Sequence, residues 1–149
     1  SNPLKATKFG LPFRHVPTYL AGYYKYKAGD QFTEGGKPVN GKRDICDIYA
    51  IMYETSESVP TLDGTNAFTS PNLISTARIN NAKETNEWTY FKLPFTTLPG
   101  KFIDKEKLMD GKYNIAIVFT SSLEGDHFNG AIGSTLLIDE AELIYHSED

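Results

Sequence analysis

Apolar and polar side chains alternate with a period of two in nearly every strongly patterned segment of this 149-residue sequence. Aromatic and β-branched residues fill the apolar positions, which is typical of half-buried strands. We find no long segment with the 3.6-residue period of an amphipathic helix. The pattern therefore predicts an all-β chain. The predicted strands cover residues 20–27, 45–54, 73–79, 88–95, 113–121 and 134–145.

The predicted connections are rich in turn residues and contain no helical crossover of the kind that parallel strands need. The segment 29–43 is longer than a usual hairpin loop, so we expect an extra short strand near 31–33 or a functional loop. Asp104 is expected to cap a helical turn that runs through Leu108 and ends at Gly111. We predict one domain, residues 1–149, folded as an antiparallel β-sandwich with jelly-roll connections.

Charge and cysteine content exclude several classes of function. Fifteen basic and 19 acidic side chains give a net charge of -4, so no basic field is available to bind nucleic acid. The single cysteine, Cys46, excludes an intrachain disulfide and a multi-cysteine metal site. No apolar run reaches the roughly 18 residues of a membrane span, so we expect no transmembrane segment.

Three segments of the chain carry a resemblance to a known family. They are 19–29 (YLAGYYKYKAG), 121–130 (SSLEGDHFNG) and 133–140 (GSTLLIDE). Together they resemble the putative carbohydrate metabolism domain of Bacteroidetes, over about Pro3 to Tyr145. The last segment also resembles the closing strand of galactose-binding-like jelly rolls.

The resemblance implies a galactose-binding-like jelly roll and a bacterial setting. Members of the family typically lie at the C-terminal end of exported proteins at the cell surface or outer membrane, behind immunoglobulin-like domains. Because the chain starts at Ser1 without a signal-peptide pattern, we expect it to be such a C-terminal domain. Some members are called glycoside hydrolases, but the resemblance brings no catalytic residue to this chain.

The strand predicted at 88–95 is a candidate ligand-binding strand. Alternation places Trp88, Tyr90 and Lys92 on one face and the apolar Phe91 on the other. Two rings could stack on the apolar face of a sugar while Lys92 donates to a hydroxyl. The alternative is that both rings pack beneath a neighbouring loop.

The first predicted strand divides its aromatic residues between two faces. Tyr24 and Tyr26 share one face, and Tyr23 shares the other with Lys25 and Lys27. We assign ligand contact to Tyr24 and Tyr26. The alternative is that these rings form aromatic cross-strand pairs that stabilise the sandwich.

A polar loop between glycines follows the strand predicted at 113–121. Glu124, Asp126, His127 and Asn129 could line a ligand pocket there. His127 could act as an acid or base, or simply form hydrogen bonds. Asp126 could recognise a ligand or hold the turn through backbone N–H groups.

Asp139 interrupts the aliphatic run of the last predicted strand, and a carboxylate buried there would need a partner. Among galactose-binding-like jelly rolls, such an acid often binds calcium together with a loop near the first strand, where Asp30 stands. The alternatives are therefore a structural calcium site at Asp139 and Asp30, or an Asp139 held by hydrogen bonds.

Hydrolysis of a glycoside requires two carboxyl groups about 5 to 5.5 Å apart for retention or about 6.5 to 9.5 Å apart for inversion. Residues with suitable chemistry are Glu54, Glu124, Asp126, Asp139 and Glu140. The leading hypothesis is a non-catalytic carbohydrate-binding or adhesion module whose partner is a glycan. The alternatives are a glycoside hydrolase, and a structural module that binds a neighbouring immunoglobulin-like domain.

Overall fold

The computed structural model describes residues 11–12, 15–56 and 68–145. Strands dominate these residues, and helical structure is limited to two short segments. The elements are β1 (Leu11–Pro12), β2 (Pro17–Lys27), β3 (Phe32–Glu34), β4 (Lys37–Pro38), β5 (Asp47–Glu54), β6 (Leu73–Arg78), β7 (Thr85–Pro94), β8 (Thr96–Thr97), α1 (Lys105–Met109), β9 (Tyr113–Thr120), the 3-10 turn η2 (Gly125–His127), β10 (Asn129–Ala131) and β11 (Thr135–Tyr145).

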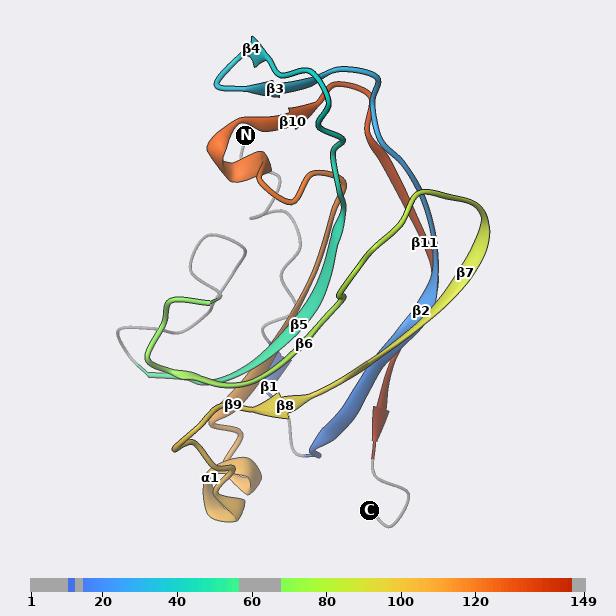
Figure 1. Cartoon of the computed structure of the whole chain (residues 1–149). Helices are drawn as coiled ribbons and strands as arrows, with labels where there is room; N and C mark the ends of the chain where they lie inside the picture. The colour runs from blue at the N-terminus through green and yellow to red at the C-terminus, as the bar shows by residue number, and fades with distance from the viewer. Residues whose placement is uncertain (1–10, 13–14, 57–67, 146–149) are drawn as a thin grey trace.

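Two sheets face each other and form the body of the molecule (Figure 1). One has the strand order β1-β9-β5-β6-β8, and the other has the order β11-β2-β7. A small third sheet, β10-β3-β4, lies at one end, and α1 lies at the opposite end. Every strand pair that the structure describes is antiparallel. The prediction of an antiparallel β-sandwich is confirmed, and its jelly-roll and galactose-binding-like details stay predictions.

All six long strands lie where the alternation predicts them, and the two local predictions are also confirmed. The extra strand near 31–33 is β3, which joins β4 through Gly35 and Gly36. Both glycines have positive φ, 57° and 84°, as a two-residue type I′ turn requires. Asp104 caps α1, because its Oδ1 accepts hydrogen bonds from the N–H groups of Glu106 and Lys107.

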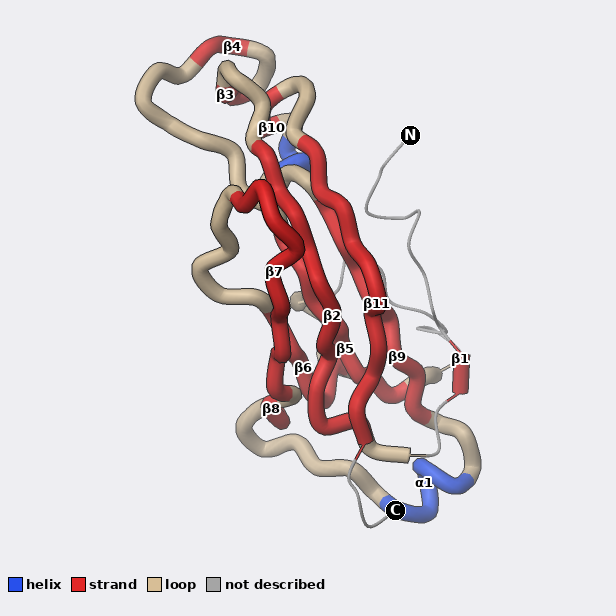
Figure 2. Tube along the Cα trace, turned by 90° about the vertical axis from the view of Figure 1, so that its right-hand side faces the viewer, coloured by secondary structure: helices blue, strands red, loops and turns tan. Residues whose placement is uncertain are grey.

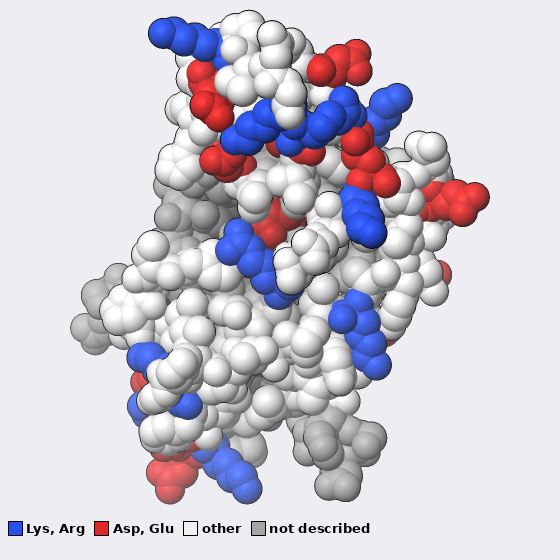
Figure 3. Space-filling model, in the orientation of Figure 1, with Lys and Arg blue, Asp and Glu red and all other residues white. Residues whose placement is uncertain are grey.

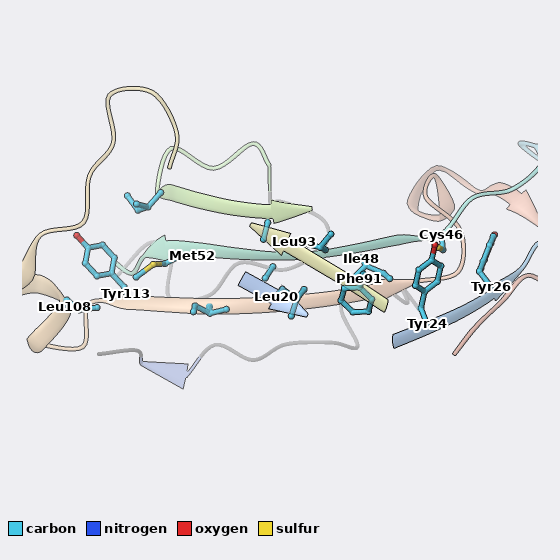
Figure 4. Packing of buried hydrophobic residues seen from close by; sticks show 14 of the residues in the cluster. Leu20, Tyr24, Tyr26, Cys46, Ile48, Met52, Phe91, Leu93, Leu108 and Tyr113 are labelled. Carbon is cyan, nitrogen blue, oxygen red and sulfur yellow. The ribbon is translucent and has the colours of Figure 1, made fainter. Parts of the chain in front are cut away.

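The main core fills the space between the two large sheets (Figure 4). Its central residues come from β2, β5, β7 and β9. Gly22 of β2 leaves room for the Phe91 ring, because a Cβ atom at position 22 would lie 2.8 Å from Phe91 Cζ. Tyr24 and Tyr26 are only 5% and 2% exposed within this core. The assignment of these two rings to ligand contact is therefore wrong, because they face the opposite sheet.

Strand β5 is buried on both faces, unlike the half-buried strand that simple alternation implies. Ile48, Ala50 and Met52 belong to the core between the sheets, while Tyr49 and Ile51 belong to a second buried cluster on the other side. Because β5 also pairs with β6 on one edge and β9 on the other, it is surrounded by protein at both edges as well as on both faces. Its nearly continuous apolar sequence is the expected signature of such a strand.

A β-bulge interrupts β11 at its acidic pair. Asp139 pairs with Tyr23 and Glu142 with Ala21, so β11 contains one more residue than β2 over this stretch. Glu140 has a φ of 51°, and its N–H donates to Asp139 Oδ1 at 2.9 Å. The bulge allows Ile138 and Leu143, an odd number of residues apart, to pack against the same core.

The buried carboxylate of Asp44, 5% exposed, fastens the end of the sandwich next to the small sheet. Its Oδ2 accepts hydrogen bonds from Ser122 Oγ (2.5 Å), Ser134 Oγ (2.6 Å) and Ala131 N (3.0 Å). Its Oδ1 accepts from Ile45 N at 3.0 Å. One side chain thus joins the segments that precede β5, follow β9, form β10 and precede β11.

We expect Asp44→Asn to destabilise the fold by about 2 kcal/mol, because an amide cannot accept hydrogen bonds at both ends of the group. Urea unfolding measures the change. The exposed Asp30→Asn is the matched control and should stay within about 0.5 kcal/mol of the wild type. Equal stability of the two variants would show that the Asp44 hydrogen bonds do not hold this end together.

The single cysteine tests how firmly the segment before β5 is closed over the core. Cys46 is buried, and this burial raises the pKa of its thiol to about 12. At pH 8 the folded protein should react with a thiol-specific reagent at least about 100-fold more slowly than the protein in urea, since the thiolate is the reactive form. Rapid labelling of the native protein would show that the segment before β5 opens readily.

Candidate functional site

Three aromatic side chains are exposed together on the outer face of the β11-β2-β7 sheet. Tyr23 of β2 is 36% exposed, and Trp88 and Tyr90 of β7 are 45% and 52% exposed. This face is turned toward the viewer in Figure 2, and no described segment crosses it. Trp88, Tyr90 and Lys92 share the face as predicted, and the alternative that these rings pack beneath a loop is wrong.

Tyr23 and Tyr90 form a cross-strand pair at the centre of this face. The two residues are register partners in β2 and β7, and their ring centroids lie 5.2 Å apart. The ring planes are tilted by 54°. Tilted pairs at this separation are favourable for aromatic rings, so the pair is a preformed feature of the sheet.

Two lysines lie on aromatic rings beside this pair. Lys25 Nζ lies 4.8 Å from the centroid of the Trp88 ring, and Lys92 Nζ lies 4.4 Å from the centroid of the Tyr19 ring. Contacts of this kind are worth about 0.5–1 kcal/mol at exposed sites. The face therefore offers hydrogen-bond donors next to stacking surfaces.

The third strand completes the surface, which we call the aromatic face. Leu137 is the register partner of Lys25, and Asp139 is the register partner of Tyr23. Both residues are exposed. The aromatic face consists of Tyr19, Tyr23, Lys25, Trp88, Tyr90, Lys92, Leu137 and Asp139.

The sequence prediction missed Tyr23, and the signal that could have found it was present. Period-two alternation places Lys25 and Lys27 on the same face as Tyr23, and it places Tyr24 and Tyr26 on the same face as Leu20. Lysines are almost never fully buried without a partner, so the lysine-bearing side of β2 had to be the solvent side.

The polar loop residues predicted as ligand contacts lie at the end of the sandwich, next to the small sheet. Lys42 Nζ bridges Glu124 Oε2 at 3.3 Å and Glu34 Oε1 at 3.1 Å. Asn129 Oδ1 accepts a hydrogen bond from Gly35 N at 3.1 Å. His127 is exposed, and the side chain of Asp126 lies outside what the structure describes.

These loop contacts join η2 and β10 to the β3–β4 hairpin and do not reach the rings of β7. The pKa of Lys42 is raised by its hydrogen bonds, first by the one to Glu34 and second by the one to Glu124. Figure 3 shows basic and acidic side chains mixed at this end of the molecule, while the middle of the visible face carries fewer charges. Apart from the buried Tyr24 and Tyr26, the predicted ligand contacts that the structure describes therefore fall into two separate groups, Trp88, Tyr90 and Lys92 on the aromatic face and Glu124, His127 and Asn129 in the loop.

A groove of about 480 Å³ lies beside the loop, between the end of β9 and the start of β11. Hydroxyl residues line it, including Ser121, Ser122 and Ser134. Two of these hydroxyls donate to Asp44, and the Ser121 carbonyl accepts from Tyr26 Oη at 2.7 Å. Most of the polar groups on this wall are thus already used by the fold.

Asp139 and Asp30 do not fit a shared calcium site. Asp139 is exposed in the bulge rather than buried, and its Oδ1 already accepts the Glu140 N–H. Gly29 N donates to Ser134 Oγ, so Asp30 lies near the start of β11, roughly 16 Å of extended strand from Asp139. Among the described residues, no group of three or more acidic, histidine or cysteine side chains could hold a metal ion.

The candidate catalytic carboxylates are also spread over the molecule. Glu54 lies at the α1 end of β5, where it accepts a hydrogen bond from Lys107 Nζ at 2.9 Å. Glu124 lies at the other end, and Asp139 and Glu140 form the bulge of β11. Glu54 and Glu124 therefore cannot act on one glycosidic bond.

No helix in the described part of the chain is long and apolar enough to cross a membrane.

Comparison with solved structures shows close relatives from Bacteroides. A crystal structure of a putative glycoside hydrolase from Bacteroides thetaiotaomicron VPI-5482 is 89% identical, with a TM-score of 0.92, over 99% of this chain and 43% of that one. A crystal structure of a putative glycoside hydrolase from Bacteroides vulgatus ATCC 8482 is 47% identical, with a TM-score of 0.86, over 98% of this chain and 59% of that one. The chain thus spans less than two thirds of either relative.

Comparison with curated proteins gave no match. The model of one protein family, the putative carbohydrate metabolism domain, matches residues 1–144. The sequence resemblance is therefore confirmed over almost the whole chain, and this protein belongs to the putative carbohydrate metabolism domain family.

Proposed function

We propose that this domain is a non-catalytic carbohydrate-binding module that holds a glycan on its aromatic face. The observation that carries the proposal is the group of three exposed rings, Tyr23, Trp88 and Tyr90, on two adjacent strands. Exposed clusters of large apolar side chains are uncommon on monomeric surfaces and often mark binding sites. The carbohydrate connection of the family supports a sugar as the ligand.

The energetics of stacking require more than one ring. Covering one aromatic side chain removes about 150 Å² from water and gives about 4 kcal/mol before any cost is counted. The loss of rigid-body freedom on binding costs about 4 kcal/mol or more, so a single ring would bind a sugar very weakly. Three rings flanked by the donors Lys25 and Lys92 can exceed this cost.

The geometry of the rings favours a single glycan chain as the ligand. Because the planes of Tyr23 and Tyr90 are tilted by 54°, both rings cannot lie flat against one planar crystalline surface. Trp88 stands two residues from Tyr90, about 7 Å along β7, so the rings extend over more than one sugar unit. A flexible chain can turn successive sugars toward successive rings.

Single-ring substitutions test the proposal. We expect Trp88→Ala and Tyr90→Ala each to weaken binding to the best ligand on a glycan array at least about 10-fold, because each loses a stacking surface. Trp88 is the sole tryptophan, so quenching or enhancement of its fluorescence should report the same binding in the wild type and in Tyr90→Ala.

Phe102→Ala provides the matched control, because this ring is 72% exposed but lies in the segment before α1. It should bind as the wild type does, and urea unfolding should show that all variants remain folded. Binding that is unaffected by loss of Trp88 and of Tyr90 would overturn the assignment of the aromatic face.

A glycoside hydrolase is the second candidate, because the two similar crystal structures are called putative glycoside hydrolases. Among the described residues, Glu34 and Glu124 lie close together, because both form an ion pair with Lys42. Each of these carboxylates already forms an ion pair with the Lys42 ammonium group, so the arrangement serves as a salt bridge between the loop and β3.

We therefore expect the isolated domain to release no reducing sugar from polysaccharides that it binds. The Glu124→Gln variant should likewise release no reducing sugar and should bind the glycan as the wild type does, because the loop lies apart from the aromatic face. Sustained turnover by the wild type that disappears in Glu124→Gln would replace the binding-module proposal with catalysis at the loop.

The partner and location follow from the same proposal. We infer an exported protein at the bacterial cell surface, in which this domain stands beside an immunoglobulin-like domain. The relatives of known structure are longer than this chain, which leaves room for such a neighbour. If the neighbour instead covers the rings, Trp88 fluorescence in the longer protein will be protected from acrylamide, and the domain will act as a structural module.

A further inference from the structure

We propose that the glycan bound by the aromatic face is acidic, with uronic acid units whose carboxylates bind Lys25 and Lys92. This inference rests on the proposed function, because it assigns the chemistry of the ligand at the same site. Uronic acids combine a ring face that can stack on an aromatic side chain with a carboxylate on the same ring. The aromatic face offers partners for both groups.

The two lysines lie on opposite sides of the central ring pair. Lys25 follows Tyr23 by two residues in β2, and Lys92 follows Tyr90 by two residues in β7. Because the strands are antiparallel and Lys92 pairs with Ala21, the lysines are offset by four positions, about 13 Å along the sheet. A chain stacked on Tyr23 and Tyr90 would therefore pass one ammonium group on each side.

The charge partners of these lysines set them apart from the paired basic residues. Carboxylates lie within 4.0 Å of several other basic groups: Lys42, Arg43, Arg78 and Lys107. No described carboxylate lies that close to Lys25 or Lys92, and both ammonium groups lie over aromatic rings. A carboxylate is a stronger partner for an ammonium group than a ring face, so a ligand carboxylate can draw each lysine away from its ring.

Strand β11 carries two acidic residues on this side of the sheet. Asp139 and Glu142 are the register partners of Tyr23 and Ala21, and both are exposed. The rings and lysines belong to β2 and β7. An acidic glycan would therefore follow β2 and β7, and the carboxylate of Asp139 would repel it from β11.

The test compares polymers that differ only in charge. Polygalacturonate and alginate are each paired with their carboxyl-reduced neutral forms, and binding to the folded domain is followed by Trp88 fluorescence. We expect the acidic form of at least one pair to bind at least about 10-fold more tightly at low salt, with the difference shrinking at high salt. Lys25→Gln and Lys92→Gln should each weaken acidic binding about 3-fold, and the double variant about 10-fold.

Two further variants act as controls. Lys105→Gln, on α1 and remote from the sheet, should leave binding unchanged. Asp139→Asn should strengthen acidic binding about 2-fold by removing a like charge, whereas a calcium site at Asp139 would make the same change weaken binding.

Each outcome decides between the two proposals. If neutral and acidic forms bind equally and binding still depends on Tyr90, the acidic ligand is wrong and the carbohydrate-binding module stands. If acidic binding is tight but unaffected by the double lysine variant, the assignment of Lys25 and Lys92 is wrong. If neither form of any pair binds and glycan arrays are blank, the proposed function fails and the inference fails with it.

Discussion

The alternation of strand β2 is the constraint on which the three-stranded sheet depends. β2 is paired on both sides, with β11 and β7, and its odd and even residues divide between solvent and core. Tyr24 and Tyr26 enter the core, while Tyr23 and Lys25 reach the outer face. A slip by one residue would exchange the two sets and bury the lysines. The register that forms the core is therefore the same register that assembles the aromatic face.

The end of the sandwich depends on a different interaction, the hydrogen bonds to Asp44. The segment 121–130, which carries part of the family resemblance, supplies Ser122 as a donor to this carboxylate. Gly130 packs so closely against Ser122 that a Cβ there would lie 2.9 Å from its Oγ. These residues thus have a structural explanation that requires no ligand, and the loop's resemblance to a family segment is weak evidence for chemistry.

Much of the fold could be predicted from the sequence because strand alternation is a local property. The six long strands, the Gly35–Gly36 turn and the Asp104 cap all follow from residues close together in the chain. The candidate site was predictable only in part, since Trp88 and Tyr90 share a strand, whereas their meeting with Tyr23 depends on register. The Asp44 hydrogen bonds join residues about 80 to 90 positions apart, and no local pattern signals them.

The acidic residues of β11 have a role in the sheet that requires no calcium ion. β11 is an edge strand of 11 residues, and a long regular edge invites pairing with another chain. The bulge at Asp139 and Glu140 breaks the regular ladder, and the charges of this pair discourage a second strand from adding there. This protection explains the acidic pair without a ligand. Asp139 and Glu142 place negative charge on β11, while Lys25 and Lys92 belong to β2 and β7, so these two strands are the part of the sheet suited to an acidic partner.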